Sequence, residues 1–167
     1  TVTVSVTDLD DTNPLITGNN GGAGSSTSSV SVNENQTTVD TFTANETVSW
    51  SLNGGADASK FSIDSSTGAL SFSSAPDYES PSDANSGNDY VVIVRATDSA
   101  SNTSDQTVTV SVTDLDDTNP LITGNNGGAG SSTSSISVNE NQTTVDTFTA
   151  NETCLLYTSD AADESLC

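Results

Sequence analysis

The feature that most constrains this chain of 167 residues is an internal repeat. Residues 1–47 match residues 107–153 at an offset of 106 positions, and the only difference is Val30 against Ile136. A unit of this length suits a β-sandwich domain of about 100 residues and exceeds the roughly 20–50 residues of common solenoid repeats. We therefore expect a tandem array produced by recent duplication. Because the chain begins inside a predicted strand, we also expect it to be part of a longer protein.

The composition favours β-structure. Met and His are absent, aromatic residues make up only 5% of the chain, and Ser, Thr, Asn, Asp and Gly dominate, which disfavours large helical cores. Short segments of alternating hydrophobicity are separated by turn clusters such as NGGAD and DSSTGA. Seven strands spaced about ten residues apart predict an all-β, seven-stranded antiparallel Greek-key (immunoglobulin-like) β-sandwich. The predicted strands are 29–33, 38–43, 48–52, 60–63, 69–73, 89–97 and 107–113.

The alternation also predicts the core. In TVTVSVT, residues 107–113, three valines fall on one face and Thr or Ser on the other, which is typical of a strand exposed on one side. For Trp50, packing in the core is a stronger interpretation than a role as a ligand platform. The expected core residues are Val108, Val110, Val112, Trp50, Phe42, Phe61, Phe72, Ile63, Leu70, Val92 and Val94.

The charge of the chain limits its partners. Two basic against 23 acidic residues give a net charge of −21, which disfavours binding to nucleic acid or to an anionic membrane. No apolar run approaches the roughly 20 residues of a membrane span, so we expect no direct membrane insertion. A chain of this charge attracts metal cations.

The acidic residues are concentrated in a string that occurs twice. TDLDDTNP occupies residues 7–14 and 113–120, and its first copy places Asp8, Asp10 and Asp11 within four residues. Such neighbours repel by about 1 kcal/mol per close pair even in water, so a bound cation is the first partner to consider. The alternative is that these residues are solvated surface acids in loops.

Three further acidic features lie at the ends of predicted strands. SVNEN places Glu34 after the first strand, APDYES places an acidic pair before the sixth, and VRATD ends the sixth. Together with the DLDDTN linker, in this order and spacing, they resemble the motifs of the cadherin repeat in its bacterial form. The matching residues are Glu34-Asn35, Asp77-Tyr78-Glu79, Ala96-Thr97-Asp98 and Asp8-Leu9-Asp10-Asp11-Thr12.

The resemblance implies Ca²⁺ sites at the junctions between consecutive repeats. Ca²⁺ takes six to eight oxygen ligands with flexible geometry, so acidic groups from separate strand ends can cage it. At the downstream junction the implied ligands are Glu34, Asp77, Glu79, Asp114, Asp116, Asp117 and Asn119. At the upstream junction they are Asp98, Asp8, Asp10, Asp11 and Asn13.

The sequence departs from the family pattern in three places. In the linker, Asp10 and Thr12 stand where the family usually has Asn. Where the family usually carries Asp-x-Asp between the second and third strands, this chain has Ala44-Asn45-Glu46-Thr47, so a third ion lacks its usual ligands. Between Pro14 and Glu34 the chain is several residues longer than the family usually needs, and the excess is Gly, Ser and Asn. This composition predicts either a flexible tether or a surface loop beside the junction.

The repeat and the motifs divide the chain into segments. After Thr153 the second copy loses all similarity to the first, and both cysteines lie in the remainder, which resembles a translated sequencing adapter. The predicted segments are the last strand and calcium linker of a preceding repeat (1–13), a Gly/Ser-rich linker (14–28), a complete domain (29–113), a calcium linker with a Gly/Ser-rich segment (114–133), the start of the next repeat (134–153) and a non-native tail (154–167).

Two functional classes stay open. The resemblance implies an adhesive or extender module of a large secreted or bacterial cell-surface protein, with neighbouring repeats and other cell-surface molecules as partners. The alternative is a structural spacer of a secreted enzyme or fibre without an adhesive role. An enzyme is not expected, because the chain has no His, only Lys60 and Arg95 as cations, and no nucleophile-elbow or phosphate-loop motif.

Overall fold

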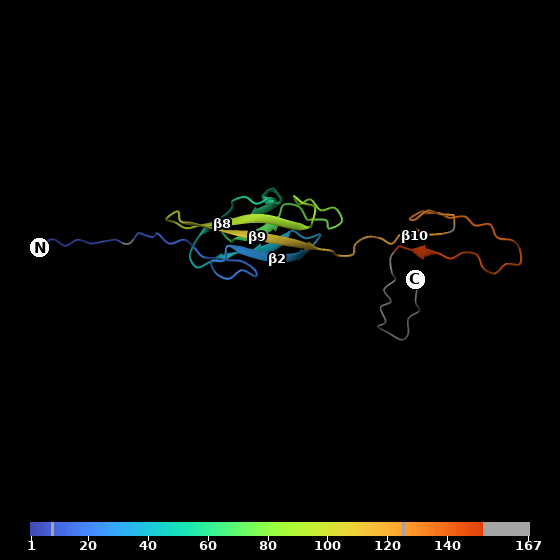
Figure 1. Ribbon diagram of the computed structural model, residues 1–167, viewed down its shortest axis with the longest axis horizontal. Helices are drawn as coiled ribbons and strands as arrows, with labels where there is room; N and C mark the ends of the chain where they lie inside the picture. Colours follow the sequence, from blue (N-terminus) through green and yellow to red (C-terminus); the bar gives the residue numbers. More distant parts are fainter. Residues whose placement is uncertain (8, 125, 152–167) are drawn as a thin grey trace, which may run out of the picture. The chain divides into compact units, whose positions relative to one another are not determined.

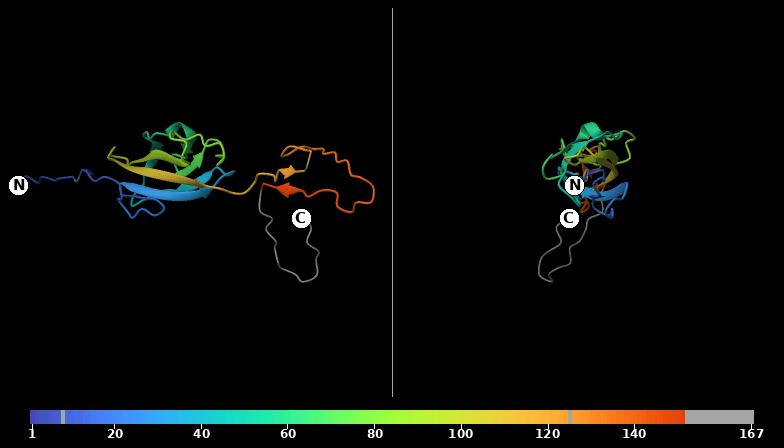
Figure 2. Two further views of the ribbon diagram at one scale, coloured as in Figure 1. Left: turned by 45° about the vertical axis from the view of Figure 1, so that its right-hand side comes forward. Right: turned by 90° about the vertical axis from the view of Figure 1, so that its left-hand side faces the viewer.

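A computed structural model describes residues 1–7, 9–124 and 126–151, in two compact units, Thr1–Leu115 and Asp116–Cys167. The predicted non-native tail lies outside the described residues. The first unit contains a two-layered β-sandwich, which can be followed in Figure 1 and Figure 2. Its elements are β1 (Ile16–Thr17), β2 (Thr27–Asn33), β3 (Thr38–Thr41), β4 (Thr43–Ala44), β5 (Ser49–Leu52), the short 3-10 helix η1 (Ala58–Lys60), β6 (Phe61–Ile63), β7 (Ala69–Phe72), β8 (Asp89–Thr97) and β9 (Thr103–Thr113).

Two sheets form the layers of the sandwich. One has the strand order β2-β9-β8-β5 and the other has the order β3-β7-β6, while β1 and β4 form a separate two-residue ladder. All seven predicted strand segments are strands in the structure, and the predicted immunoglobulin-like β-sandwich is confirmed.

The pairing of the first and last strands corrects one expectation. The sequence predicts a wholly antiparallel sandwich, but β2 runs parallel to β9, from Thr27 opposite Thr107 to Asn33 opposite Thr113. Because the two strands run in the same direction, the chain enters at one end of the sandwich and leaves at the other. Hydrophobic alternation could not reveal this, since it fixes which face of a strand is buried and not the direction of its partner.

The core agrees with the sequence pattern. Val108, Val110 and Val112 of β9 are all buried, as are the other expected core residues except Ile63, which is partly buried against them. Tyr90 was not among the expected residues, yet it is 1% exposed and packs edge-on against Phe72, with ring centroids 5.1 Å apart. The ring of Phe72 in turn stacks on that of Phe61 at 4.5 Å.

The Gly/Ser-rich stretch takes part in the fold. Its first part forms β1, and Ile16 lies in the core with 1% exposure. The following loop is tied to β9, because the buried Gln106 side chain donates from Nε2 to the carbonyl of Ser25 at 2.8 Å. A side chain at Gly18 would lie within 2.6 Å of Phe42 and Gln106, so only glycine fits there. The structure therefore agrees with a surface loop rather than a flexible tether.

The two copies of the repeated sequence differ in structure. Residues 1–7 repeat residues 107–113, yet they form no strand, and Val2, Val4 and Val6 are 79–90% exposed. In the second unit the described residues form β10 (Ile122–Thr123) and β11 (Thr149–Ala150), paired in the same register as β1 and β4. Phe148, the counterpart of Phe42, is 59% exposed there. Strand formation and burial thus depend on partner strands and not on local sequence alone.

This difference generates a matched stability test. Phe42→Ala should lower the free energy of unfolding of the first unit by about 3–5 kcal/mol, because it removes a large side chain that is 1% exposed. Phe148→Ala makes the same change at the exposed counterpart and should have almost no effect. Urea unfolding followed by Trp50 fluorescence measures both. Equal losses in the two variants would contradict the burial difference.

Candidate metal sites

The first acidic cluster lies where the chain leaves the sandwich, and we call it the downstream cluster. It consists of Glu34, Glu79 and Asp114, which each offer a carboxylate oxygen within 4.8 Å of the others. The strand pairing explains the arrangement, because Asn33 and Thr113 are partners at the ends of β2 and β9. The residues that follow them, Glu34 and Asp114, are therefore neighbours, and Glu79 reaches them from the loop between β7 and β8.

Glu34 is the fixed member of this cluster. Its side chain is only 2% exposed, and its two oxygens accept hydrogen bonds from the backbone N–H of Tyr78 at 2.8 Å and of Leu115 at 2.9 Å. One carboxylate thus ties the loop that carries Glu79 to the linker that carries Asp114. Each accepting oxygen keeps lone-pair capacity for a further partner.

The second acidic cluster lies where the chain enters the sandwich, and we call it the upstream cluster. It consists of Asp10, Glu46 and Asp98, whose carboxylate oxygens also lie within 4.8 Å of one another. Asp98 follows β8 and is buried. Asn102 donates to Asp98 from its backbone and from its side chain, both at 2.8 Å, and its side chain also donates to the carbonyl oxygen of Asp10 at 3.1 Å.

The electrostatics of the upstream cluster favour a cation. Burial acts to raise the pKa of Asp98, but the hydrogen bonds from Asn102 and from the backbone outweigh it, so the pKa is lowered and the group stays charged. The pKa of Glu46 is raised, first by burial and then by the negative charges of Asp10 and Asp98. A positive ion between the three carboxylates would relieve this repulsion.

The structure brings together only some of the residues that the sequence implicates. Glu34, Glu79 and Asp114 converge, as do Asp10 and Asp98. Asp77 instead accepts a hydrogen bond from the backbone of Ser80 at 3.0 Å and lies outside both clusters. Asp8 lies outside the described residues. Asp11 and Asn13 are exposed in the first unit, and Asp116, Asp117 and Asn119 are exposed in the second.

Glu46 belongs to the upstream cluster but was not among the residues expected from the sequence. It occupies the segment where the family usually has Asp-x-Asp, and its position was interpreted as the loss of a site. The longer Glu side chain brings a single carboxylate to Asp10 and Asp98. The sequence feature that could have indicated Glu46 is an acidic residue in the segment where the family usually has Asp, with a side chain one methylene longer.

Two buried carboxylates have a structural role that the sequence did not distinguish. Asp57 accepts hydrogen bonds from the backbone N–H of Ala84 at 2.7 Å and of Val91 at 2.8 Å. Asp83 accepts from the backbone of Asn85, Gly87 and Asn88 at 3.0–3.3 Å. Both residues are at most 6% exposed, and together they shape the loop between β7 and β8 that carries Glu79.

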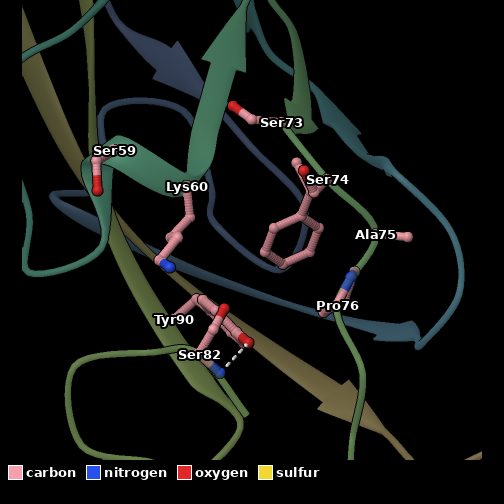
Figure 3. A pocket seen from close by; sticks show the side chains of 9 residues that line it. Ser59, Lys60, Ser73, Ser74, Ala75, Pro76, Ser82 and Tyr90 are labelled. Atoms are coloured by element: carbon pink, nitrogen blue, oxygen red, sulfur yellow. Dashed lines mark hydrogen bonds between the residues drawn. The ribbon is translucent and has the colours of Figure 1, made fainter. Parts of the chain in front are cut away.

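The two basic residues lie apart from these clusters. Arg95 forms a two-pronged ion pair with Asp105, at 2.7 Å from Nε and 2.8 Å from Nη2. Lys60 lines a pocket of about 180 Å³, where the Tyr90 hydroxyl accepts from the backbone N–H of Ser82 at 3.2 Å (Figure 3). An ammonium group in this pocket disfavours the binding of a second cation, so the pocket is no candidate for Ca²⁺.

A comparison with protein families gives a match to the Cadherin domain over residues 24–113, more than half of the chain. The chain belongs to the cadherin domain family. Cadherin domains are typically calcium-dependent, extracellular adhesion repeats without enzymatic activity. This match agrees with the motifs that the sequence analysis identified, and it confirms the cadherin resemblance.

Solved cadherin structures share the fold. Human CDH23 EC21-23 is 21% identical with a TM-score of 0.55, and the match covers 71% of this chain and 38% of that one. Mouse cadherin-23 EC22-24 is 21% identical with a TM-score of 0.53, covering 67% and 36%. Drosophila N-cadherin EC1-4 is 22% identical with a TM-score of 0.51, covering 66% and 27%. These neighbours are built from several consecutive repeats, of which this cadherin chain spans well under half.

A curated relative is halomucin of Haloquadratum walsbyi strain DSM 16790 / HBSQ001. It is 51% identical over 37 residues, which cover 22% of this chain and, to the nearest per cent, 0% of halomucin. This similarity is therefore confined to a short segment. Within the described residues of the cadherin chain, no helix has the length and apolar character that a membrane span needs.

The buried carboxylate Asp83 gives a prediction for pH. Burial alone would raise the pKa of Asp83, but three backbone hydrogen bonds lower it below the ordinary value of 3.8. The charged form therefore stabilises the fold above the unfolded-state pKa, and this contribution is lost as the pH falls through the lower folded-state pKa. Asp83→Asn should reduce the free energy of unfolding by about 1–3 kcal/mol at neutral pH, because it weakens charge-assisted hydrogen bonds.

Urea unfolding of both chains over a series of pH values measures this effect. The difference between the parent chain and Asp83→Asn should shrink once the pH falls below 3.8. A difference that stays constant down to the acid limit of folding would contradict the role assigned to the charged form.

Proposed function

We propose that this chain is part of a calcium-binding cadherin array that serves as an adhesive or extender module of a large secreted or cell-surface bacterial protein. The proposal depends mainly on one observation. The parallel pairing of β2 and β9 places one cluster of three carboxylates at each end of the sandwich, where the chain continues into the neighbouring repeat.

The two clusters supply the ligand type that Ca²⁺ requires. Three carboxylates at each end provide hard, negatively charged oxygen atoms, but six to eight oxygens are needed. We infer that linker residues complete the sets. In this proposal Asp77, Asp116, Asp117 and Asn119 join the downstream cluster, and Asp8, Asp11 and Asn13 join the upstream cluster.

The charge of the chain supports the same function. With a net charge of −21, few carboxylates can find a basic partner, and Arg95 already pairs with Asp105. Bound Ca²⁺ would neutralise the linker charges and hold consecutive repeats at a fixed angle. The neighbouring repeats are then the first partners, and other cell-surface molecules would bind to the array as a whole. We assign no catalytic activity to this domain.

Calcium titration tests the proposal. Extracellular calcium modules bind with dissociation constants of about 10⁻⁴ to 10⁻³ M, and a tenfold excess over this constant would add about 1.4 kcal/mol per site to stability. The whole chain should therefore show heat in calorimetric titration with CaCl₂ and a calcium-dependent rise in melting temperature. MgCl₂ at the same concentration should do less, because Mg²⁺ demands a stricter octahedral geometry.

A matched pair of variants identifies the site. Glu79→Gln removes one charge from the downstream cluster and should abolish much of the calcium-dependent rise. Glu140→Gln makes the same chemical change at an exposed position of the second unit and should keep the rise. If the parent chain gives neither heat nor a shift in melting temperature at millimolar Ca²⁺, the carboxylates are only surface acids and the proposed function is wrong.

A further inference from the structure

The ladder between β1 and β4 ends in an unusual way. Ile16 is paired with Ala44, so the next residues opposite each other are Leu15 and Asn45. The backbone N–H of Asn45 donates to the carbonyl of Leu15 at 3.3 Å, as expected in a ladder. The backbone N–H of Leu15, however, donates to Oδ1 of the Asn45 side chain at 2.6 Å. The side chain of Asn45 thus replaces the backbone carbonyl of Asn45 as the acceptor. The ladder ends there, and the backbone bends at residues 45–46.

The linker before β1 is held at two places. At one end Asn45 fixes the amide of Leu15, and at the other the Asn102 side chain donates to the carbonyl oxygen of Asp10 at 3.1 Å. Between these contacts Pro14 is buried, and its ring restricts the backbone angle φ. A segment of six residues is therefore positioned at both ends, and it carries Asp10 into the upstream cluster.

The contact between Leu15 and Asn45 recurs in the second copy. Leu121 donates to Oδ1 of Asn151 at 2.6 Å, and the backbone of Asn151 donates to the carbonyl of Leu121 at 3.3 Å. Both distances equal those at Leu15 and Asn45. Phe148 is 59% exposed in this unit, so the contact forms without a packed aromatic side chain at that position. The contact therefore recurs where the aromatic side chain is largely exposed.

We propose that Asn45 is a positioning residue for the upstream cluster. By holding the linker at Leu15, it keeps Asp10 beside Glu46 and Asp98. This inference rests on the proposed calcium function and adds a residue that offers no carboxylate to the ion. Its effect is to order the linker before the ion binds. A preorganised linker loses less conformational entropy on binding, so affinity rises without an additional ligand.

Asn45→Ala in the whole chain tests the inference. Asn45 is exposed, so water can satisfy the Leu15 amide and the sandwich should stay folded. We expect the dissociation constant for Ca²⁺ at the upstream cluster to rise about fivefold, as for the loss of one hydrogen bond. The readout is the NMR shift of the Asn102 side-chain amide during titration with CaCl₂. The Tyr78 amide, which donates to Glu34, reports the downstream cluster and should titrate unchanged.

Asn53→Ala is the matched control. It removes another exposed Asn side chain, which donates to Asp105 at 3.1 Å and lies outside both clusters, and it should leave both titrations unchanged. If Asn45→Ala titrates like the parent chain at Asn102, or weakens both clusters equally, the positioning role is wrong while the calcium function stands. If the parent chain itself shows no response at either reporter, the calcium function fails and this inference fails with it.

Discussion

The parallel pairing of β2 with β9 is the contact on which the rest of the cadherin domain depends. It joins the first and last strands of the sandwich over seven residue pairs and adds β2 at the edge of the four-stranded sheet. Because these strands run in the same direction, the incoming and outgoing linkers lie at opposite ends of the domain. The same register makes Glu34 and Asp114 neighbours, and Asp98 follows the antiparallel partner β8 at the other end. One strand pairing therefore sets both the direction of the array and the positions of its acidic clusters.

The many carboxylates of this chain repel one another, and the domain contains two groups of carboxylates that differ in how their charge is stabilised. Asp57 and Asp83 are buried but accept backbone hydrogen bonds, so their charge is stabilised by peptide dipoles and shapes a loop. The upstream carboxylates are different, because Asp10 and Glu46 remain close without a basic side chain in their cluster. The raised pKa of Glu46 reflects burial first and then this repulsion. Asp57 and Asp83 are therefore stabilised without an ion, whereas a bound cation would stabilise Asp10 and Glu46.

Much of the fold was predictable from the sequence, because alternating hydrophobicity identifies half-buried strands, and the valines of β9 are buried as predicted. The direction of β2 relative to β9 was not predictable, since alternating hydrophobicity fixes the buried face of a strand and not the direction of its partner. For the candidate site, the order and spacing of the motifs implied Glu34, Glu79, Asp98 and the linker acids, of which the structure brings Asp10 and Asp114 into the two clusters. Order and spacing could not separate Asp77, which accepts from the Ser80 backbone, from Glu79, which joins the cluster. Glu46 was not predictable from the motif, because it stands where the family usually has Asp-x-Asp and only the fold brings its carboxylate to Asp10 and Asp98.

The repeated sequence separates what forms in both copies from what needs a partner strand. The valines of residues 1–7 are exposed, while the same residues in β9 are buried, so this strand requires its neighbours β2 and β8. The ladder of two residue pairs and the Asn side-chain contact occur in both copies, so they form in the second unit although Phe148, the counterpart of Phe42, is exposed there. In the complete domain the linker is held from one side by Asn45 and from the other by Asn102, which also donates to Asp98, so both contacts position Asp10 in the upstream cluster.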